Sequence, residues 1–523
     1  MSPRLLALAI DAANADLVER WAADGTLPVL RGLLAEGLSG RTRSVEGLFV
    51  GSTWPSLTTA LSPARHGYHS LSQLRPGSYE PGRPQDGARV HGEPFWDHLA
   101  RCGVRSAVLD VPLARPSGRL AAQVVEWGSH STLYGFGAKP ERLAAELAAH
   151  FGARAHEAPC AAELRTPEAW AGYVARLERE AARKGELTRF VLAREPVDFA
   201  LQVFSEAHCA GHHAWHLHDP AHPSHDAALA AALGAPLRRV YAAVDAAIGA
   251  VIADWPAATV VVFAAHGMSH LHGAQFLLRD VLVRLGVTAP ATPRPPTSRE
   301  RAAGLAGGAW LGLPAPLRRA LQPLKARVWR GPTPAPRGLG VDAAASLCFP
   351  VSNGLAVGGI RLNLAGREPA GRLAPGAEAD AFSAELAAEL CALRDERTGR
   401  ALVRAVRRTR DLWQGERLDA LPDLLVEWSD DAPLGSSALA NGRAAAVRAV
   451  SPRLGVLESV NAYDRTGEHR SEGFFVARGP GIAPGRLARV VSTLDLAPSF
   501  CARLGAPMTG VDGRALDELV ATG

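Results

Sequence analysis

The sequence is poor in cysteine, and its cysteines lie far apart. The six cysteines in 523 residues are Cys102, Cys160, Cys209, Cys348, Cys391 and Cys501, and no two form a C-x-x-C pair. So low a count argues against a disulfide-stabilised scaffold, and this spacing argues against a thiolate zinc site. We therefore interpret the cysteines as scattered small residues that serve packing.

Excess charge of one sign and long apolar runs are also scarce. The chain has 57 Lys and Arg residues and 52 Asp and Glu residues, which gives a net charge of +5. This excess of positive charge is too small to indicate a dense nucleic-acid-binding patch. The first apolar run, Leu5–Ile10, ends at Asp11, and no later run approaches the roughly 18 apolar residues of a membrane span. We expect a soluble cytoplasmic protein that binds neither a nucleic-acid duplex nor a membrane. The sequence does not specify its oligomeric state.

The apolar runs that are present are short and continuous, which is typical of strands covered on both faces. They are Leu5–Ile10, Phe199–Phe204, Val260–Ala265, Leu424–Glu427 and Gly473–Ala477. Stretches with helical spacing of apolar residues lie between them: Asp16–Glu36, Pro140–Phe151, Pro167–Glu195 and Asp226–Asp254. This alternation predicts an α/β fold with a mostly parallel central sheet and helices on both faces. Polar residues follow several strand runs, where open α/β sheets bind their ligands.

The segment from 288 to 340 has a different composition, dense in proline and arginine. Turn-forming and helix-breaking residues dominate it, so we predict an insertion in a discontinuous catalytic domain of residues 1–287 and 341–523. Two interpretations of the insertion stay open. It is either a flexible segment or a mobile cap whose basic residues attract an anion.

Histidine is the residue that is concentrated. The chain has 18, of which seven fall within 18 residues: His208, His212, His213, His216, His218, His222 and His225. His208 and His212 are four residues apart, so a helix places both imidazoles on one face, which is a metal-ligand spacing. No glutamate follows His208, so this is not the metalloprotease pattern. We interpret His218, His222 and His225 as a solvated loop.

Asp11 and Thr53 are candidates that follow or precede a predicted element. Asp11 directly follows the first strand run, where a carboxylate serves either as a helix cap or as a metal ligand. Thr53 lies two residues before Pro55, at the expected start of a helix. A hydroxyl there is either a cap or, beside a metal ion, a nucleophile toward phosphorus.

Two further histidines stand alone in the sequence. His266 follows the run Val260–Ala265 and precedes Gly267, so a buried strand delivers it into a turn, which favours a ligand. His469 precedes the run Gly473–Ala477 in a predicted loop, and by itself it indicates little.

In their order and local sequence these segments resemble the alkaline phosphatase superfamily, and most closely its type I phosphodiesterase/nucleotide pyrophosphatase family. The resemblance includes Ser62-Pro63 with His66-Gly67, and the closing stretch from Gly479 to Arg514. It covers nearly the whole chain outside 288–340. It implies an alkaline-phosphatase-like three-layer sandwich with an insertion or cap.

The resemblance also implies two divalent metal ions, with zinc in first place and manganese or iron as alternatives. By motif position, Asp11, Thr53 and His266 would hold one ion, and His212 and His469 would hold the other. Thr53 falls at the position of the family's nucleophile. We therefore expect Thr53 to act both as a metal ligand and as the attacking hydroxyl.

Two positions depart from the family pattern. His208 stands where the family has an aspartate four residues before the second histidine, so one ion would have the neutral set His208, His212 and His469. Ala265 stands where the family has an aspartate next to His266, which removes a carboxylate from the other ion. Three alternatives follow: the second ion binds weakly, His270 or His272 substitutes, or catalysis relies on the three-histidine ion.

These residues predict a metal-dependent hydrolase that cleaves phosphodiester or pyrophosphate bonds of a small phosphorylated substrate through Thr53. Alternatives are a phosphomonoesterase, a phosphonate or sulfate-ester hydrolase on the same fold, or a degenerate member that binds metal or a phosphorylated ligand without turnover. The sulfatase route is disfavoured because Leu57 stands where that motif needs arginine. Asn363 and Arg367 lie in a segment that resembles one near the family's site, and they are candidate substrate contacts.

Overall fold

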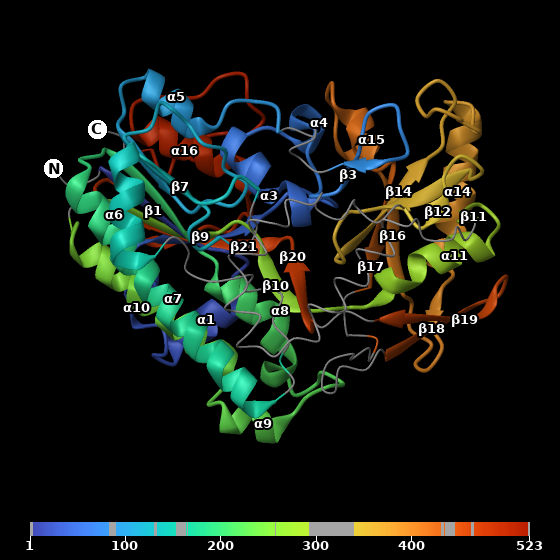
Figure 1. Ribbon diagram of the computed structural model, residues 1–523, viewed down its shortest axis with the longest axis horizontal. Coiled ribbons are helices and arrows are strands. Elements are labelled where there is room, and N and C mark those ends of the chain that lie inside the picture. Colours follow the sequence, from blue (N-terminus) through green and yellow to red (C-terminus); the bar gives the residue numbers. More distant parts are fainter. Residues whose placement is uncertain are drawn as a thin grey trace, which may run out of the picture.

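The computed structural model describes residues 4–82, 90–129, 133–152, 164, 166–256, 258–291, 339–429, 434, 445–461 and 465–520. Within this part of the chain, a large α/β lobe lies beside a smaller lobe of mainly antiparallel strands (Figure 1). Residues 292–338 of the predicted insertion lie outside the described residues. The residues that flank them, β11 (Ala289–Pro290) and β12 (Val341–Asp342), pair with each other as antiparallel strands.

The large lobe is built on a ten-stranded sheet with the order β22-β2-β21-β9-β1-β8-β5-β6-β7, in which β23 also pairs with β2. The strands from β9 to β6 in this order run parallel, whereas β21 is antiparallel to both of its neighbours. Their bounds are β1 Leu5–Ile10, β2 Leu38–Arg43, β5 Ser106–Leu109, β6 Ala122–Val125, β7 Gly137–Lys139, β8 Phe199–Phe204, β9 Thr259–Ala264, β21 Glu472–Arg478, β22 Gly485–Arg486 and β23 Val491–Ser492. The mostly parallel sheet is as predicted.

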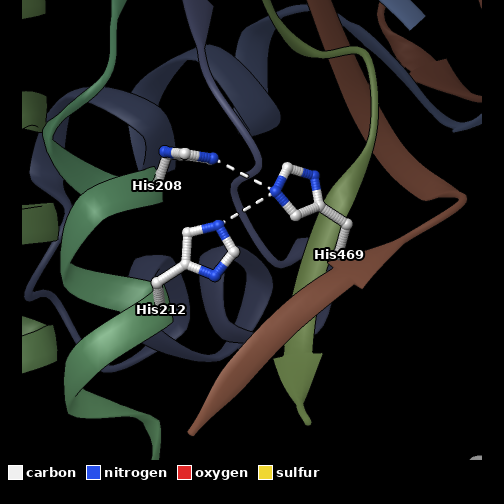
Figure 2. Close-up of side chains that lie close together, drawn as sticks. All are labelled: His208, His212 and His469. Atoms are coloured by element: carbon white, nitrogen blue, oxygen red, sulfur yellow. Dashed lines mark hydrogen bonds between the residues drawn. The ribbon is translucent and has the colours of Figure 1, made fainter. Parts of the chain in front are cut away.

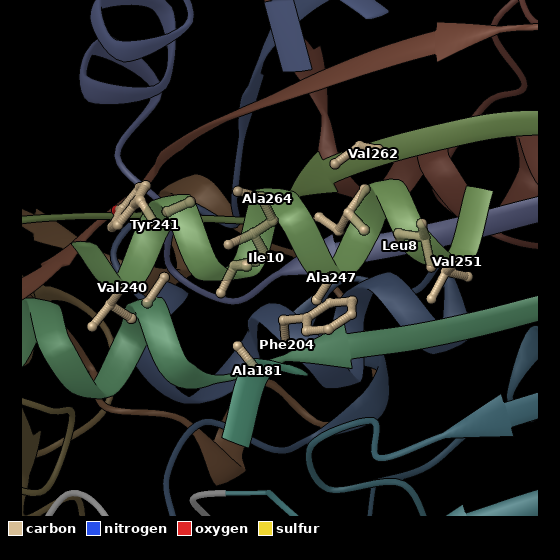
Figure 3. Close-up of a cluster of buried hydrophobic side chains, with 14 of the residues drawn as sticks. Leu8, Ile10, Ala181, Phe204, Val240, Tyr241, Ala247, Val251, Val262 and Ala264 are labelled. Atoms are coloured by element: carbon tan, nitrogen blue, oxygen red, sulfur yellow. The ribbon is translucent and has the colours of Figure 1, made fainter. Parts of the chain in front are cut away.

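Helices cover both faces of this sheet, because successive residues of each strand point to opposite sides. In β1, Leu6, Leu8 and Ile10 enter one apolar cluster, and Leu5, Ala7 and Ala9 enter another. The first cluster packs under α1 (Ala15–Ala23), α2 (Pro28–Glu36), α6 (Glu141–Phe151), α7 (Pro167–Arg194), α8 (Glu206–His218) and α10 (Pro236–Ala253), as Figure 3 shows in part. The second packs under α3 (Phe49–Thr59), α5 (Phe95–Arg101) and α16 (Leu496–Arg503). The predicted three-layer α/β arrangement is confirmed.

Two stretches predicted as single helices are each divided. Asp16–Glu36 forms α1 and α2, and Gly25 between them has a φ of 85°. Asp226–Asp254 forms α9 (Ala227–Ala232) and α10, and Gly234 between them has a φ of 63°. Glycine adopts this left-handed conformation without the steric cost of a side chain, and the chain turns there.

One helical stretch in the described part of the chain, Ala227–Ala253, is long and apolar enough to cross a membrane, which by itself is weak evidence. Most of this stretch belongs to α10, which packs against α7 and α8 in the large lobe. Val240, Val244 and Ile248 of α10 are fully buried in the first apolar cluster. The apolar character of α10 is therefore used within the protein core.

The smaller lobe has its own apolar core, which the sequence analysis did not predict. It contains the antiparallel sheet β13-β14-β17-β16, the sheet β15-β18-β19, and helices α11 and α14 (Figure 1). The bounds are α11 Leu278–Arg284, β13 Cys348–Val351, β14 Val357–Leu362, α14 Ala377–Cys391, β15 Arg394–Asp395, β16 Val403–Arg408, β17 Leu424–Trp428, β18 Ala445–Ser451 and β19 Gly455–Asn461.

Short elements complete the described structure. They are α4 Pro63–His66, β3 Gln73–Leu74, β4 Pro81–Gly82, β10 Gly267–His270, η3 Ala274–Leu277, α15 Thr409–Leu412, η4 Leu418–Ala420, β20 Gly467–Arg470 and η5 Thr493–Asp495. The pair β10 and β20 is antiparallel, and Met268 lies opposite His469. This pair extends from the two strands β9 and β21 toward α8, and it carries a candidate ligand.

The central sheet allows a matched test of its packing. Val476 of β21 is fully buried, whereas Val460 of β19 is 53% exposed. Val476→Ala removes buried methyl groups and leaves a cavity, so we expect a loss of roughly 2 kcal/mol in the free energy of unfolding. Val460→Ala should change it by less than about 0.5 kcal/mol. Urea titrations of both variants measure this difference, and equal losses would contradict the assigned core.

Candidate active site

Polar residues gather where the parallel strands of the central sheet end. Asp11 follows β1, Asp110 follows β5, Glu206 begins α8 just after β8, and His266 follows β9. The register Ile10 to Phe204 and Ala9 to Phe263 brings three of these strand ends level with one another. The polar residues that follow these strands therefore lie at one edge of the sheet, where open α/β sheets bind their ligands.

Three histidines converge next to this edge. Helix α8 presents His208 and His212 on one face, and β20 presents His469 toward them (Figure 2). The Nε2 atom of His469 lies 3.1 Å from Nε2 of His208 and 3.0 Å from Nε2 of His212. All three residues are buried, and their ligand atoms lie within 4.8 Å of one another. The structure thus brings together the three ligands that the sequence assigned to one ion.

The ring of His212 is held in a defined orientation. Its Nδ1–H donates to the carbonyl oxygen of Gly467 at 2.8 Å, which leaves the lone pair on Nε2 facing the other two rings. Burial lowers the pKa of His212 well below its ordinary value. Because only the neutral imidazole binds metal ions, both features favour ligation.

Glycines allow α8 and β20 to approach this closely. A Cβ atom on Gly467 would lie 2.0 Å from the carbonyl oxygen of Gly211, and one on Gly211 would lie 2.7 Å from the Met268 side chain. Neither position accepts a larger residue without moving backbone or side chain. The position of His469 relative to α8 therefore depends on Gly467.

His266 lies beside the three histidines but outside their group. Its ring stacks on the ring of His469 with a centroid distance of 4.7 Å and an interplanar angle of 13°. Among the described residues, neither of its ring nitrogens has a hydrogen-bond partner, and burial lowers its pKa to about 3. His266 is therefore neutral at ordinary pH and supports one face of His469.

One of the two carboxylate oxygens of Asp11 is bonded to a neighbouring side chain. Its Oδ1 accepts a hydrogen bond from the indole Nε1–H of Trp54 at 3.0 Å. Burial raises the pKa of Asp11 to about 7, although the bond from Trp54 and the charge of Lys184 act in the opposite direction. The sequence motif contained Trp54 but did not indicate this role.

The sequence predicted that Thr53 lies at the start of a helix, and this prediction is wrong. Helix α3 begins at Phe49, so Thr53 lies in its second turn and is 1% exposed. Its hydroxyl donates to the Phe49 carbonyl oxygen at 2.5 Å and lies 2.5 Å from Oγ of Ser44. The amide groups around Thr53 are used within the helix, so the predicted anion site at a helix N-terminus does not form there. The helix begins earlier than predicted because Phe49 packs into the apolar contact between the lobes.

A buried lysine lies beneath the sheet edge, and the sequence analysis missed it. The Nζ atom of Lys184 in α7 lies 3.1 Å from Glu206 and 3.4 Å from Asp110, and all three side chains are about 1% exposed. Burial lowers the pKa of Lys184, but the negative charges of Glu206 and Asp110 together raise it above its ordinary value. Burial likewise raises the pKa of Glu206. The signal was its position on the apolar stripe of α7, in line with Leu177 and Ala181.

Asn363 and Arg367, the candidate substrate contacts, have structural partners in the smaller lobe. Asn363 is fully buried: its Nδ2 donates to three backbone carbonyls, and its Oδ1 accepts from Tyr79. Arg367 pairs with Glu368 and Asp423. Arg367 also lines a cavity of about 590 Å³. These contacts give both residues a structural role, and their contact with substrate stays a prediction.

His66, from the sequence segment Ser62 to Gly67, holds a turn. Its Nδ1 accepts from the backbone N–H of Tyr68 at 3.1 Å, so its Nε2–H donates to Ser56 Oγ at 2.8 Å. Both bonds require the neutral ring. Burial lowers the pKa of His66 to about 3.

This burial predicts acid sensitivity. The folded-state pKa of His66 lies below the ordinary 6.5, so its contribution to stability is complete above pH 6.5 and is lost as pH falls toward 3. Over this window the residue contributes a slope of about 1.4 kcal/mol per pH unit. Urea unfolding of the metal-free protein between pH 7 and 4 should show a smaller slope in His66→Gln. The exposed His150→Gln is the control, and equal slopes in the two variants would contradict this assignment.

The comparison with protein-family models agrees with the sequence motifs. The family model described as type I phosphodiesterase/nucleotide pyrophosphatase matches residues 5–294. A search of curated proteins found no match. Among solved structures, the chain is similar to phosphonoacetate hydrolase from Sinorhizobium meliloti 1021 in complex with phosphonoacetate, with 15% identity, a TM-score of 0.48, and coverage of 95% of this chain and 94% of that one. It is also similar to human ectonucleotide pyrophosphatase/phosphodiesterase 5, with 11% identity, a TM-score of 0.47, and coverage of 98% and 97%.

Proposed function

The chain belongs to the type I phosphodiesterase/nucleotide pyrophosphatase family, and we propose that it is a metal-dependent hydrolase of phosphodiester or pyrophosphate bonds in small phosphorylated substrates. The family consists of hydrolases that act on phosphoester bonds. The observation that carries the metal dependence is the convergence of His208, His212 and His469 on one point. The proposed attacking group is the hydroxyl of Thr53.

The three histidines fit a zinc ion. Zinc binds histidine nitrogen at about 2.0–2.1 Å in tetrahedral geometry, which places two such nitrogens about 3.3 Å apart. The observed separations of 3.1 and 3.0 Å to His469 are close to this value. Three neutral imidazoles with an open fourth position are a donor set of catalytic rather than structural zinc sites. Manganese and iron remain alternatives, since they also accept imidazole.

When bound, the ion supplies positive charge that polarises a phosphoryl oxygen and stabilises the charge that develops during transfer. The chain's own residues do the rest. Lys184 fixes Glu206 at the first turn of α8, two residues before His208. Since Thr53 donates to the Phe49 carbonyl, Ser44 donates to Thr53 Oγ1 and orients it. For attack on phosphorus, the Thr53 hydroxyl must give up its bond to Phe49 and lose its proton.

A second candidate function rests on that same hydroxyl. Thr53 is buried in a helical turn and bonded internally, and Ala265 replaces an expected carboxylate. Both features favour a member that binds metal or a phosphorylated ligand without turnover. Activity toward phosphomonoesters, phosphonates or sulfate esters is a further alternative on this fold, and a panel of these substrates separates it from diesterase activity.

The nucleophile has a direct test. We expect Thr53→Ala to abolish hydrolysis of an activated aryl phosphodiester, because no other hydroxyl stands at that motif position, and to leave the metal content nearly unchanged. Thr58→Ala is the matched control, since Thr58 lies in the same helix and also donates to a backbone carbonyl. Wild-type turnover in Thr53→Ala would show that another group attacks. An inactive wild-type protein that binds zinc would favour the non-catalytic function.

The metal site has a test that does not depend on turnover. His212→Ala removes one of three ligands, so we expect zinc affinity to fall by at least a factor of about 100. His213→Ala is the matched control, because His213 is the adjacent buried histidine and instead packs against Tyr173. Competition with a chromogenic chelator measures both affinities. Equal affinities in the two variants would contradict the three-histidine assignment.

A further inference from the structure

A cavity of about 440 Å³ lies between the two lobes, beside the strand that carries His469. Its wall is formed by the residues around the start of α3, by the residues on either side of His469, and by parts of β14, β16 and β17. We propose that this cavity binds the organic group of the substrate and selects a hydroxyl-rich group, such as a sugar or a polyol. The proposal rests on the proposed function, since it places the phosphoryl group at the three histidines.

The cavity reaches the candidate metal site and the proposed nucleophile. Glu468 lines it, and Oε1 of Glu468 lies 3.9 Å from Nε2 of His469, the nitrogen that faces the other two rings. Phe49 lines it as well, and the carbonyl oxygen of Phe49 accepts the hydroxyl of Thr53. The position of the ion and the attacking group therefore both lie next to residues of the cavity wall. An organic group attached to a phosphoryl group held there would extend into the cavity.

The charged side chains of the wall are balanced in number. Among the described residues, the wall contains four arginines and four glutamates: Arg43, Arg404, Arg407, Arg470, Glu46, Glu427, Glu468 and Glu472. Several of them form ion pairs. The Nε atom of Arg407 lies 2.9 Å from Glu427 and 3.4 Å from Glu46. Arg43 lies 3.4 Å from Glu472. The wall therefore has no large excess of either sign with which to attract a second charged group of the substrate.

The charges differ in depth. The side chains of Glu427 and Glu468 are 10% and 5% exposed. Those of Arg404 and Arg407 are 57% and 46% exposed. A second phosphate or carboxylate group on the substrate would thus face buried carboxylates at the inner end. A cationic group would instead lie beside arginines that already pair with Glu427.

A hydroxyl group matches such a wall, because it donates one hydrogen bond and also accepts. It can donate to a carboxylate oxygen and accept from a guanidinium without adding charge. Trp428 supplies a further donor to the wall: it is 4% exposed, and among the described residues its Nε1–H has no acceptor. Buried donors without an acceptor are uncommon in native structures, and a substrate oxygen would supply one. An apolar group would take these polar groups out of water without offering them a partner.

The test compares phosphodiesters that differ in one organic group. Methyl phosphodiesters of glucose, cyclohexylmethanol, choline and glycolic acid present a hydroxyl-rich, an apolar, a cationic and an anionic group. Calorimetry measures their dissociation constants on the full-length, zinc-loaded Thr53→Ala variant. We expect the glucose diester to bind about tenfold more tightly than each of the others, as two or three additional hydrogen bonds would produce.

Equal affinities, tighter binding of another diester, or no measurable binding of the glucose diester would overturn the inference. Phosphorus NMR of the wild-type protein with the same four diesters tests the proposed function separately. Hydrolysis of none of them would contradict diesterase activity, whereas the calorimetric order of affinities does not depend on turnover.

A tryptophan variant tests the wall itself. Trp428→Phe keeps an aromatic ring and removes the N–H, so we expect affinity for the glucose diester to fall about three- to tenfold. Affinity for the cyclohexylmethyl diester should stay unchanged. Trp255→Phe is the matched control, because Trp255 is also buried but lies in the first apolar cluster, away from this wall. Circular dichroism checks that both variants are folded. Equal losses for the two diesters in Trp428→Phe would overturn the assignment of its N–H to the substrate.

Discussion

The contact between helix α8 and strand β20 is the constraint on which the candidate site depends. Gly211 and Gly467 face each other in this contact, and a Cβ atom added to Gly467 would lie 2.0 Å from the carbonyl oxygen of Gly211. The hydrogen bond from His212 to Gly467 spans the same contact and joins residues 255 positions apart. Because His212 belongs to the helix and His469 to the strand, any change in this approach separates two of the three ligands. The geometry of the proposed metal centre is therefore set by backbone packing.

The buried charged side chains beneath α8 fix the position of this helix more than they stabilise the fold. Lys184 lies between Asp110 and Glu206, and all three are withdrawn from water. The free-energy cost of removing these charges from water offsets much of the attraction between them, so a buried ion pair is weak evidence for stability. It does fix geometry, because any shift of Glu206 away from Lys184 leaves a buried charge without a partner. Since Glu206 begins α8, this requirement also fixes the turn that carries His208.

The sequence could predict what depends on local pattern. Continuous apolar runs identified the core strands, and the four-residue spacing predicted that His208 and His212 lie on one face of a helix. It could not predict the separate core of the smaller lobe or the bond between Trp54 and Asp11, because both depend on packing between distant segments. The start of α3 was also missed, since Phe49 extends the helix by packing between the lobes rather than by a capping residue. The burial of Lys184 was not predicted, because a charged residue in a helix is usually exposed.

The two departures from the family pattern act together on the charge of the site. His208 and Ala265 each stand where a carboxylate is expected, and with His208 the proposed ion at the three histidines would have only neutral ligands. Of the carboxylates that remain at the sheet edge, Asp110 and Glu206 share Lys184, and Asp11 accepts a hydrogen bond from Trp54. A divalent ion there would keep most of its positive charge for the ligand in its open position. An anionic phosphoryl group is the ligand that this charge would favour, so the two replacements would strengthen the hold of the proposed ion on its substrate.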